Sequence, residues 1–270
     1  MKLCCSSPMV PGQTLTEKAQ KLRLWGYDAI AVFQPYNEWS DELREELGSL
    51  EKRTGVRAAE FVFMDASYGN AMSPDDELRN RCRAMYRHAA TVCGEIGAVT
   101  EIEYQYGPQD PMPLFDPYQQ LSQDQEDDFT AFYRQVLDLV AGTPARVLLE
   151  PINRYESRYL NRIADNIRII DAVAHPNAGL LPDTFHMSIE EADMGKALIE
   201  AGRRIAQVHL GDSNRLLPGH GLLNWPDIFE ALNTVGYDGY VNLECSTTGD
   251  PAVTLPATAA SLRDLARVRS

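Results

Sequence analysis

The sequence of 270 residues lacks two features that would place it at a membrane or outside the cell. No apolar stretch approaches the roughly 20 residues that a membrane-spanning helix needs, so a soluble protein without a membrane partner is expected. Residues 1–8 carry one positive charge but no apolar run of about 7 to 15 residues, so they do not have the pattern of a secretory signal. We therefore expect a cytoplasmic protein.

Cysteine and positive charge are also scarce. The five cysteines are scattered, odd in number and without a Cys-x-x-Cys pair, so reduced thiols are predicted instead of a disulfide framework or a zinc motif. Lys and Arg number 25 against 39 Asp and Glu, which gives a net charge of -14. This charge repels phosphate backbones, so no nucleic-acid partner is expected.

What the sequence does contain is a regular alternation of short apolar runs with longer amphipathic ones. Such alternation is typical of βαβ units around a parallel sheet. Eight pairs are present, and the length fits the roughly 250 residues of a (β/α)8 TIM barrel, so we predict an α/β fold with residues 1–270 as a single domain. The predicted strands are residues 2–5, 28–33, 56–63, 99–104, 146–150, 178–181, 205–210 and 240–245.

Eight helices are predicted between these strands. They span residues 15–25, 39–54, 75–96, 123–141, 160–174, 195–201, 225–235 and 252–266. Two longer segments, 106–122 and 212–224, follow the fourth and seventh strands. Because loops after the strands form the active-site mouth of a TIM barrel, both segments are expected to cover a substrate.

Four candidate metal ligands recur at the ends of successive late strands. They are Glu150, Asp183, His209 and Glu244, and the separations along the chain are 33, 26 and 35 residues. Each step is about one βα unit of roughly 30 residues, which places all four side chains on the same rim of a closed barrel. Three carboxylates and one imidazole suit one divalent ion: Mn²⁺ is expected first, Mg²⁺ or Co²⁺ are alternatives, and Zn²⁺ is less favoured.

The segments around these ligands carry a family resemblance. They are Glu-Pro-Ile-Asn-Arg-Tyr-Glu (150–156), Asp-Thr-Phe-His-Met (183–187), His-Leu-Gly-Asp-Ser-Asn-Arg (209–215) and Leu-Glu (243–244). Together they resemble the sugar isomerase/epimerase superfamily of xylose isomerase-like TIM barrels, and most closely the D-tagatose and D-psicose (allulose) 3-epimerases. The resemblance is strong over residues 146–245 and only architectural before them.

The resemblance implies a role for each matching residue. Glu150, Asp183, His209 and Glu244 would bind the metal ion, and Glu150 and Glu244 would also be the catalytic pair that removes and returns the C3 proton of a ketose or keto sugar acid. The reaction would pass through a metal-bound enediolate. Glu156, His186 and Arg215 would contact the substrate. Arg215 is the only Lys or Arg in residues 208–224, which favours a sugar without phosphate.

Two departures from the group concern the choice of sugar. Residues 218–221 (Pro-Gly-His-Gly) are followed by Leu222 where a second His is common, and residues 245–248 (Cys-Ser-Thr-Thr) replace an aromatic residue after the last Glu.

Four aromatic residues near strand ends either pack in the core and rim or lie against a sugar. They are Phe33, Trp39, Tyr104 and Tyr106. Related barrels often pair, so a homo-oligomer, either a dimer or a tetramer, is expected by analogy.

Other reactions stay open at this stage. An aldose-ketose isomerase of the hydroxypyruvate isomerase type would use the same ion and bases, and a sugar lyase would use the same enolate. An endonuclease of the kind that repairs abasic DNA would need several zinc ions and histidines from the early strands, whereas the first histidine here is His88, in the third predicted helix. A sugar-binding protein without catalysis is the last alternative.

Overall fold

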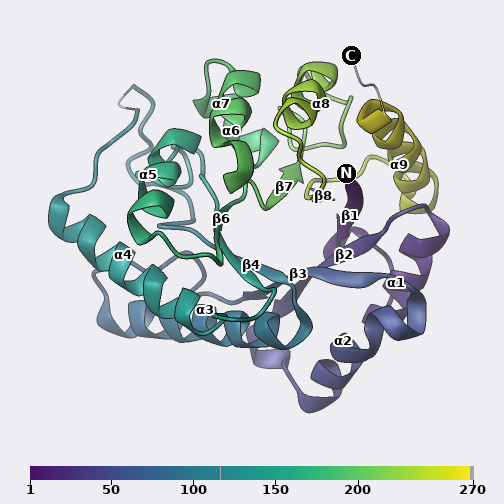
Figure 1. Ribbon diagram of the computed structural model, residues 1–270, viewed down its shortest axis with the longest axis horizontal. Coiled ribbons are helices and arrows are strands. Elements are labelled where there is room, and N and C mark those ends of the chain that lie inside the picture. Colours follow the sequence, from purple (N-terminus) through teal and green to yellow (C-terminus); the bar gives the residue numbers. More distant parts are fainter. Residues whose placement is uncertain (116, 268–270) are drawn as a thin grey trace.

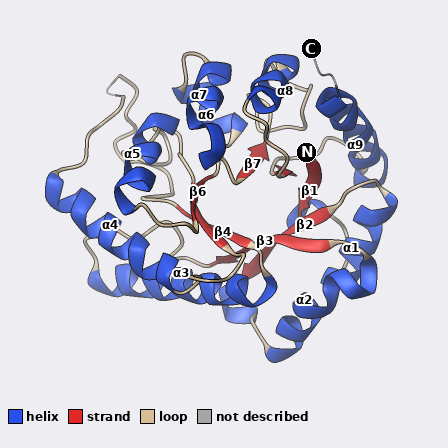
Figure 2. Cartoon of the chain, viewed as in Figure 1, coloured by secondary structure: helices blue, strands red, loops and turns tan. Residues whose placement is uncertain are grey.

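Eight parallel strands form the centre of the molecule (Figures 1 and 2). The computed structural model describes residues 1–115 and 117–267, so Asp116, within the segment 106–122, lies outside the described residues. The strands are β1 (Lys2–Ser6), β2 (Ala29–Pro35), β3 (Arg57–Met64), β4 (Val99–Ile102), β5 (Arg146–Leu149), β6 (Ala178–Leu180), β7 (Gln207–Leu210) and β8 (Tyr240–Leu243).

The sheet closes on itself between β6 and β7. The hydrogen-bonded strand order runs from β6 through β5, β4, β3, β2, β1 and β8 to β7. Two isolated bridges, Leu180 with Ile205 and Asp183 with His209, join the remaining edges. The predicted (β/α)8 TIM barrel is therefore confirmed, and two of the four predicted ligands pair directly at its closing seam.

Helices surround the strands on the outside of the barrel (Figure 2). They are α1 (Leu15–Leu24), α2 (Asp41–Thr54), α3 (Asp76–Ile96), α4 (Gln123–Asp138), α5 (Ile163–Val173), α6 (Thr184–Glu190), α7 (Met194–Ala201), α8 (Trp225–Thr234) and α9 (Pro251–Arg267). Three single turns of 3-10 helix, η1 (Ser7–Met9), η2 (Tyr36–Glu38) and η3 (Gly202–Arg204), lie between them. Within the described residues, no helix combines the length and apolarity needed to cross a membrane.

Local sequence signals explain where many of these helices begin and end. Ser40 and Asp75 accept hydrogen bonds from the first turns of α2 and α3, as N-caps do. Gly55 and Gly97 end the same two helices in the left-handed conformation, which glycine adopts without steric cost. These capping residues define where α2 and α3 begin and end. They therefore also limit where the neighbouring strands begin and end.

The structure differs from the predicted elements mainly at strand ends and at one helix. Strand β4 ends at Ile102, two residues before the predicted end, and β7 begins at Gln207 instead of residue 205. Helix α6 was not predicted, because its seven residues are too few to show a helical period. It forms because Asp183 caps it, accepting hydrogen bonds from the main-chain N–H groups of Phe185 (2.6 Å) and His186 (3.2 Å).

Candidate active site

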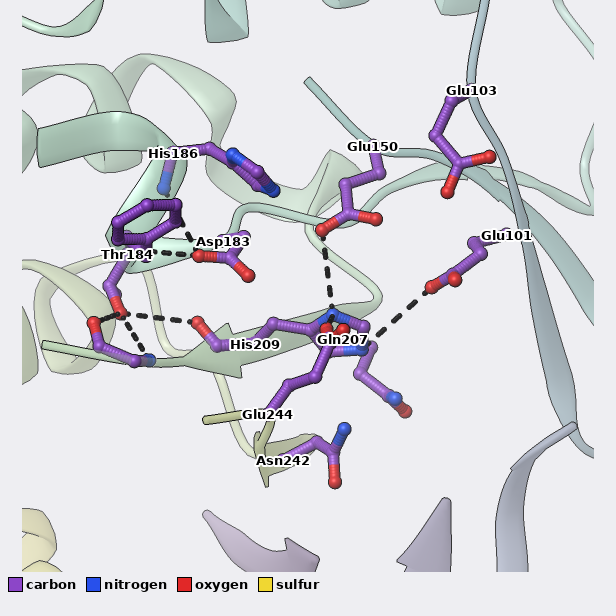
Figure 3. Close-up of polar contacts among 12 residues, drawn as sticks. Glu101, Glu103, Glu150, Asp183, Thr184, His186, Gln207, His209, Asn242 and Glu244 are labelled. Atoms are coloured by element: carbon purple, nitrogen blue, oxygen red, sulfur yellow. Dashed lines mark hydrogen bonds and ion pairs between the residues drawn. The ribbon is translucent and has the colours of Figure 1, made fainter. Parts of the chain in front are cut away.

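The four predicted metal ligands converge at the carboxyl ends of the late strands (Figure 3). Glu150 and Glu244 directly follow β5 and β8, His209 lies within β7, and Asp183 follows β6. One ligand atom from each of the four lies within 4.8 Å of all the others. Asp183 and His209 are fully buried, Glu150 is buried, and the side chain of Glu244 is 25% exposed. The spacing along the chain therefore predicted a real cluster.

Three of these ligand atoms have no hydrogen-bond partner outside the four candidate ligands among the described residues. They are buried and belong to Asp183 (Oδ2), His209 (Nδ1) and Glu244 (Oε2). His209 Nδ1 lies 2.5 Å from Glu244 Oε2 and 3.5 Å from Glu150 Oε1. Buried polar atoms without partners are costly, and a divalent cation would satisfy all of them at once. The residues present therefore fit a metal ion with oxygen and imidazole ligands.

The charges of the cluster set unequal pKa values on its two glutamates. Burial and the nearby Glu244 and Asp183 raise the pKa of Glu150 well above its usual range. Burial also opposes the ionisation of Glu244, but the charges of His209 and Arg215 outweigh it and lower the pKa of Glu244 to about 2. Burial would lower the pKa of His209, yet Glu60 and Glu244 together raise it. The surroundings of the two glutamates thus shift their pKa values in opposite directions.

His186 and Arg215 lie on one side of this cluster and present donors to the same point. His186 Nδ1 lies 2.7 Å from the side-chain nitrogen of Asn153, whose amide is oriented by a hydrogen bond from the Tyr155 N–H to its oxygen (2.9 Å). Burial lowers the pKa of His186, so the ring is neutral and must carry its proton on Nε2. Nε2 lies 3.2 Å from Arg215 Nη1, so two donors converge where a substrate oxygen could accept from both.

Glu156 joins the same group through Asn153. Its Oε2 atom accepts a hydrogen bond from the Asn153 side chain (2.7 Å) and lies 3.6 Å from His186 Nδ1. The side chain is 33% exposed, more than those of His186 and Asn153. All three predicted substrate-contacting residues are therefore brought together beside the metal cluster.

The loop between β7 and α8 holds Arg215 in place. Arg215 has a φ of 60°, in the left-handed region, and its main chain bonds to Asp212 (N–H donor, 2.8 Å) and to Ser246 (carbonyl acceptor, 2.8 Å). The buried carboxylate of Asp212 accepts four hydrogen bonds, from the N–H groups of Ser213, Gly219 and Leu223 and from the Trp225 indole. A β-carbon at Gly221 would lie 2.1 Å from this carboxylate, so only glycine fits there.

Two adjoining hollows open over the cluster and share Phe33, Arg215 and Glu244. The inner hollow is also lined by Met64, Tyr68, Glu101, Glu103, Tyr106, Glu150, Ile152 and His186. The outer hollow, about 240 Å³ in volume, is completed by Ser6, Pro8, Met9, Cys245 and Ser246. Among the described residues, Arg215 is the only Lys or Arg lining either hollow.

Comparison with known proteins now decides the family. The sequence pattern described as the xylose isomerase-like TIM barrel matches residues 19–267. The chain belongs to the xylose isomerase-like TIM barrel family. The predicted resemblance is thus confirmed.

Relatives of this xylose isomerase-like barrel are named as sugar epimerases. The chain is 29% identical over 231 residues to the D-psicose 3-epimerase of Ruminiclostridium cellulolyticum, covering 84% of this chain and 76% of that protein. It is 37% identical over 111 residues to the 3-dehydro-D-guloside 4-epimerase of Escherichia coli, covering 41% and 42%. The structure of E. coli 3-keto-D-glucoside 4-epimerase matches with a TM-score of 0.84 at 23% identity, over 98% of this chain and 99% of that one, which shows a shared fold.

The early strands add acidic residues to this family barrel that the sequence did not suggest. Glu60 lies in β3 and Glu101 in β4, and Glu103 follows β4; all three are buried. The Tyr68 hydroxyl contacts Glu101 Oε1 at 2.6 Å and also contacts Glu103, whose other oxygen accepts a hydrogen bond from Tyr86 (2.6 Å). The available signal was the Glu-x-Glu pattern itself, because acids are rarely buried in a parallel strand without a purpose.

The four aromatic residues near strand ends divide into two pairs. Phe33 and Tyr106 line the inner hollow. Trp39 packs edge-on against Phe61 and Phe63, with ring centroids 5.3 and 5.2 Å apart. Tyr104 packs against Phe129 and Tyr159. Of these four residues, Phe33 and Tyr106 are therefore the two placed to contact a ligand in the inner hollow, which Tyr68 also lines.

Proposed function

We propose that this member of the family is a metal-dependent sugar epimerase, with residues 1–270 as one catalytic domain, that inverts C3 of a ketose. One observation carries the proposal: Glu150 and Glu244 come from β5 and β8, yet both approach the same nitrogen of His209, at 3.5 and 2.5 Å. Inverting a carbon needs an acid and a base on opposite faces, and these two carboxyl groups reach one centre from different strands. The epimerase names of the relatives support the same reaction class.

The proton transfers are assigned to the two glutamates. A divalent cation held by Glu150, Asp183, His209 and Glu244 would supply a Lewis acid that favours negative charge on the substrate oxygens by several kcal/mol. One of the two carboxyl groups takes the C3 proton, and the other, protonated, returns a proton to the opposite face. Either of the two can act first, depending on which epimer is bound.

The donors beside the cluster stabilise the enediolate of the substrate. His186 Nε2 and Arg215 Nη1 lie 3.2 Å apart, and both residues line the inner hollow. Fixed donors aimed at a developing oxyanion lower its energy without reorganising during the reaction. Glu156 is bonded to Asn153 and is not among the residues that line the two hollows, so its contact with a substrate hydroxyl stays a prediction.

The lining of the inner hollow favours an uncharged sugar. Glu101, Glu103, Glu150 and Glu244 line it, and Arg215 is the only described Lys or Arg that does. A phosphate would place negative charge among these carboxyl groups, and so would the acid group of a keto sugar acid. We therefore propose a ketose without phosphate as the substrate, with a keto sugar acid as the weaker alternative.

A C4 epimerisation of a keto-glycoside is the second candidate, because the chain shares 37% of 111 residues with the E. coli 4-epimerase. The same bases would then act one carbon further along the sugar. An aldose-ketose isomerase would instead move a proton between C1 and C2 and give an aldehyde. The position of proton exchange separates all three.

The test is proton exchange in deuterated water. Chelator-treated protein reloaded with Mn²⁺ is incubated with a panel of ketoses, ketohexonates, keto-glycosides and sugar phosphates, and each carbon-bound proton is followed by NMR. We expect deuterium at C3 and a second ketose as product. Deuterium at C4 would favour the second candidate, and an aldehyde the isomerase.

Two variants test the mechanism on the substrate found in this way. Glu150→Gln and Glu244→Gln keep the size and a ligand oxygen of each side chain but remove its proton chemistry, so each is expected to lower product formation by about 10³-fold or more. Near-normal conversion by either folded variant would contradict the two-base mechanism. Manganese as the preferred ion, assembly into a dimer or tetramer, and a cytoplasmic location stay predictions.

A further inference from the structure

A buried hydrogen bond crosses the barrel beneath the metal cluster. The two carboxylate oxygens of Glu60 lie 3.1 and 3.0 Å from His209 Nε2, and both side chains are fully buried. Glu60 comes from β3 and His209 from β7, which are diametrically opposite strands of an eight-stranded barrel. This contact therefore links the early half of the barrel to a residue of the late half.

The carboxylate of Glu60 is itself held in position from the late strands. Its Oε2 atom accepts a hydrogen bond from the side chain of Gln207 (2.5 Å) and a longer one from Asn242 (3.4 Å). Asn242 also donates to the hydroxyl of Ser6 (3.0 Å). Gln207 and His209 are two residues apart in β7, so both point to the same face of the strand. A rigid network thus fixes the acceptor that faces the imidazole.

The orientation of the ring follows from this contact. A carboxylate only accepts hydrogen bonds, so Nε2 must carry a proton when it bonds to Glu60. The other nitrogen, Nδ1, then faces the cluster, 2.5 Å from Glu244 Oε2 and 3.5 Å from Glu150 Oε1, where a metal ion would take the place of a shared proton. Glu101 does not share this role, because its Oε2 atom stands 3.9 Å from Nε2.

We infer that Glu60 is a positioning residue that holds His209 with its Nε2 protonated and its Nδ1 directed at the metal ion. The inference rests on the proposed function, since the ion is part of it. Hydrogen bonds from a ligand histidine to a carboxylate fix the tautomer and strengthen the ligand, and their loss weakens metal affinity by about 10- to 100-fold.

The experiment compares two variants that carry the same Glu-to-Gln change. Glu60→Gln replaces the carboxyl group that bonds to the ring, and Glu101→Gln replaces a similarly buried carboxyl group whose Oε2 atom stands 3.9 Å from His209 Nε2. The Kd for Mn²⁺ is measured by calorimetry on the chelator-treated full chain. We expect Glu60→Gln to raise the Kd by about 10- to 100-fold and Glu101→Gln by less than about threefold.

A second measurement needs no variant and no metal ion. In metal-free wild-type protein labelled with ¹⁵N-histidine, NMR is expected to show a proton on His209 Nε2 that exchanges slowly with water. A Kd unchanged in Glu60→Gln, equal losses in both variants, or a ring protonated only on Nδ1 would each overturn the inference. If wild-type protein binds no Mn²⁺, the proposed metal-dependent function fails, and the NMR result alone decides the role of Glu60.

Discussion

The late and early halves of the barrel both bring acidic side chains to the centre, but they do so in different ways. In the late half, from β5 to β8, three of the four ligands sit at or just beyond the strand ends, and among the described residues three of the ligand atoms have no hydrogen-bond partner outside the cluster. In the early half, Glu60 and Glu103 have both carboxylate oxygens occupied by neighbouring side chains, and of the three buried glutamates there only Glu101 has an oxygen, Oε2, without a partner among the described residues. Atoms without a partner are available to a cation, whereas occupied atoms hold other groups in place.

The two halves therefore have different expected roles: the late half offers atoms to a cation, and the early half orients neighbouring side chains. Asp183 can offer its Oδ2 atom without breaking a hydrogen bond, and the oxygens of Glu150 and Glu244 that face the cluster contact His209 Nδ1, itself a candidate ligand. Glu103 would have to give up Tyr68 and Tyr86 to do the same. We therefore expect losses of metal and turnover from changes in the late half, and smaller effects on orientation and stability from changes in the early half.

The largest effect is expected from Asp183→Ala, because Asp183 offers one oxygen to the cluster and caps α6 with the other. Turnover should fall by about 10³-fold or more, and metal analysis should find little bound ion. Asp193→Ala is the matched control, since Asp193 is an exposed cap of α7. It should cost about 1 kcal/mol of stability and leave turnover unchanged. If Glu103→Gln lost as much metal as Asp183→Ala, the contrast between the halves would be wrong.

The next effect is expected from Arg215→Leu. Its guanidinium lies 3.4 Å from Glu244 Oε1 and lowers the pKa of that carboxyl group. Steady-state kinetics should show kcat/KM reduced by about 100-fold. The pKa of Glu244 should rise, so the acid limb of the pH profile should move to higher pH. Arg203→Leu, which removes an exposed charge at the other end of the barrel, should change neither.

A smaller effect, on stability, is expected from Asp212→Asn in the loop that carries Arg215. An amide can accept fewer of the four hydrogen bonds, so the free energy of unfolding should fall by about 1 to 3 kcal/mol in a urea titration at neutral pH. Burial opposes ionisation of Asp212, but the Trp225 indole and the loop N–H groups lower its pKa. The stability difference should therefore shrink as the pH falls below about 4. Asp227→Asn, on the first turn of α8, is the control, and an equal loss there would point to a general charge effect.

The smallest effect concerns Glu103. Burial raises its pKa to about 7, although Tyr68 and Tyr86 oppose the rise. The folded protein therefore binds a proton that the unfolded chain releases near pH 4.3, so wild-type stability should fall as the pH rises from about 4 to 7. Glu103→Gln cannot lose this proton, so its stability relative to wild type should grow over that range in urea titrations. A constant difference would show that Glu103 does not change its protonation between these pH values.

The same contrast explains how much could be predicted from the sequence. Asp183 and His209 could be found because they follow apolar runs at intervals of one βα unit. Closure of the barrel then brings their side chains together. Glu101 and Glu103 alternate correctly for one face of a strand, but alternation does not say whether that face is the barrel interior or the helix layer. The partner of Glu60 is 149 residues away, and no local pattern connects them.

Asp183 connects the candidate metal site with His186, because each of its two oxygens faces one of them. Its Oδ1 atom accepts from the main-chain N–H of His186, while its Oδ2 atom faces the ion cluster. The proposed ion and the imidazole proposed to contact the substrate would thus be connected through a single carboxylate and one turn of helix. If so, exchanging one metal for another of different radius would also shift the imidazole, and the choice of ion would adjust how tightly the substrate is held.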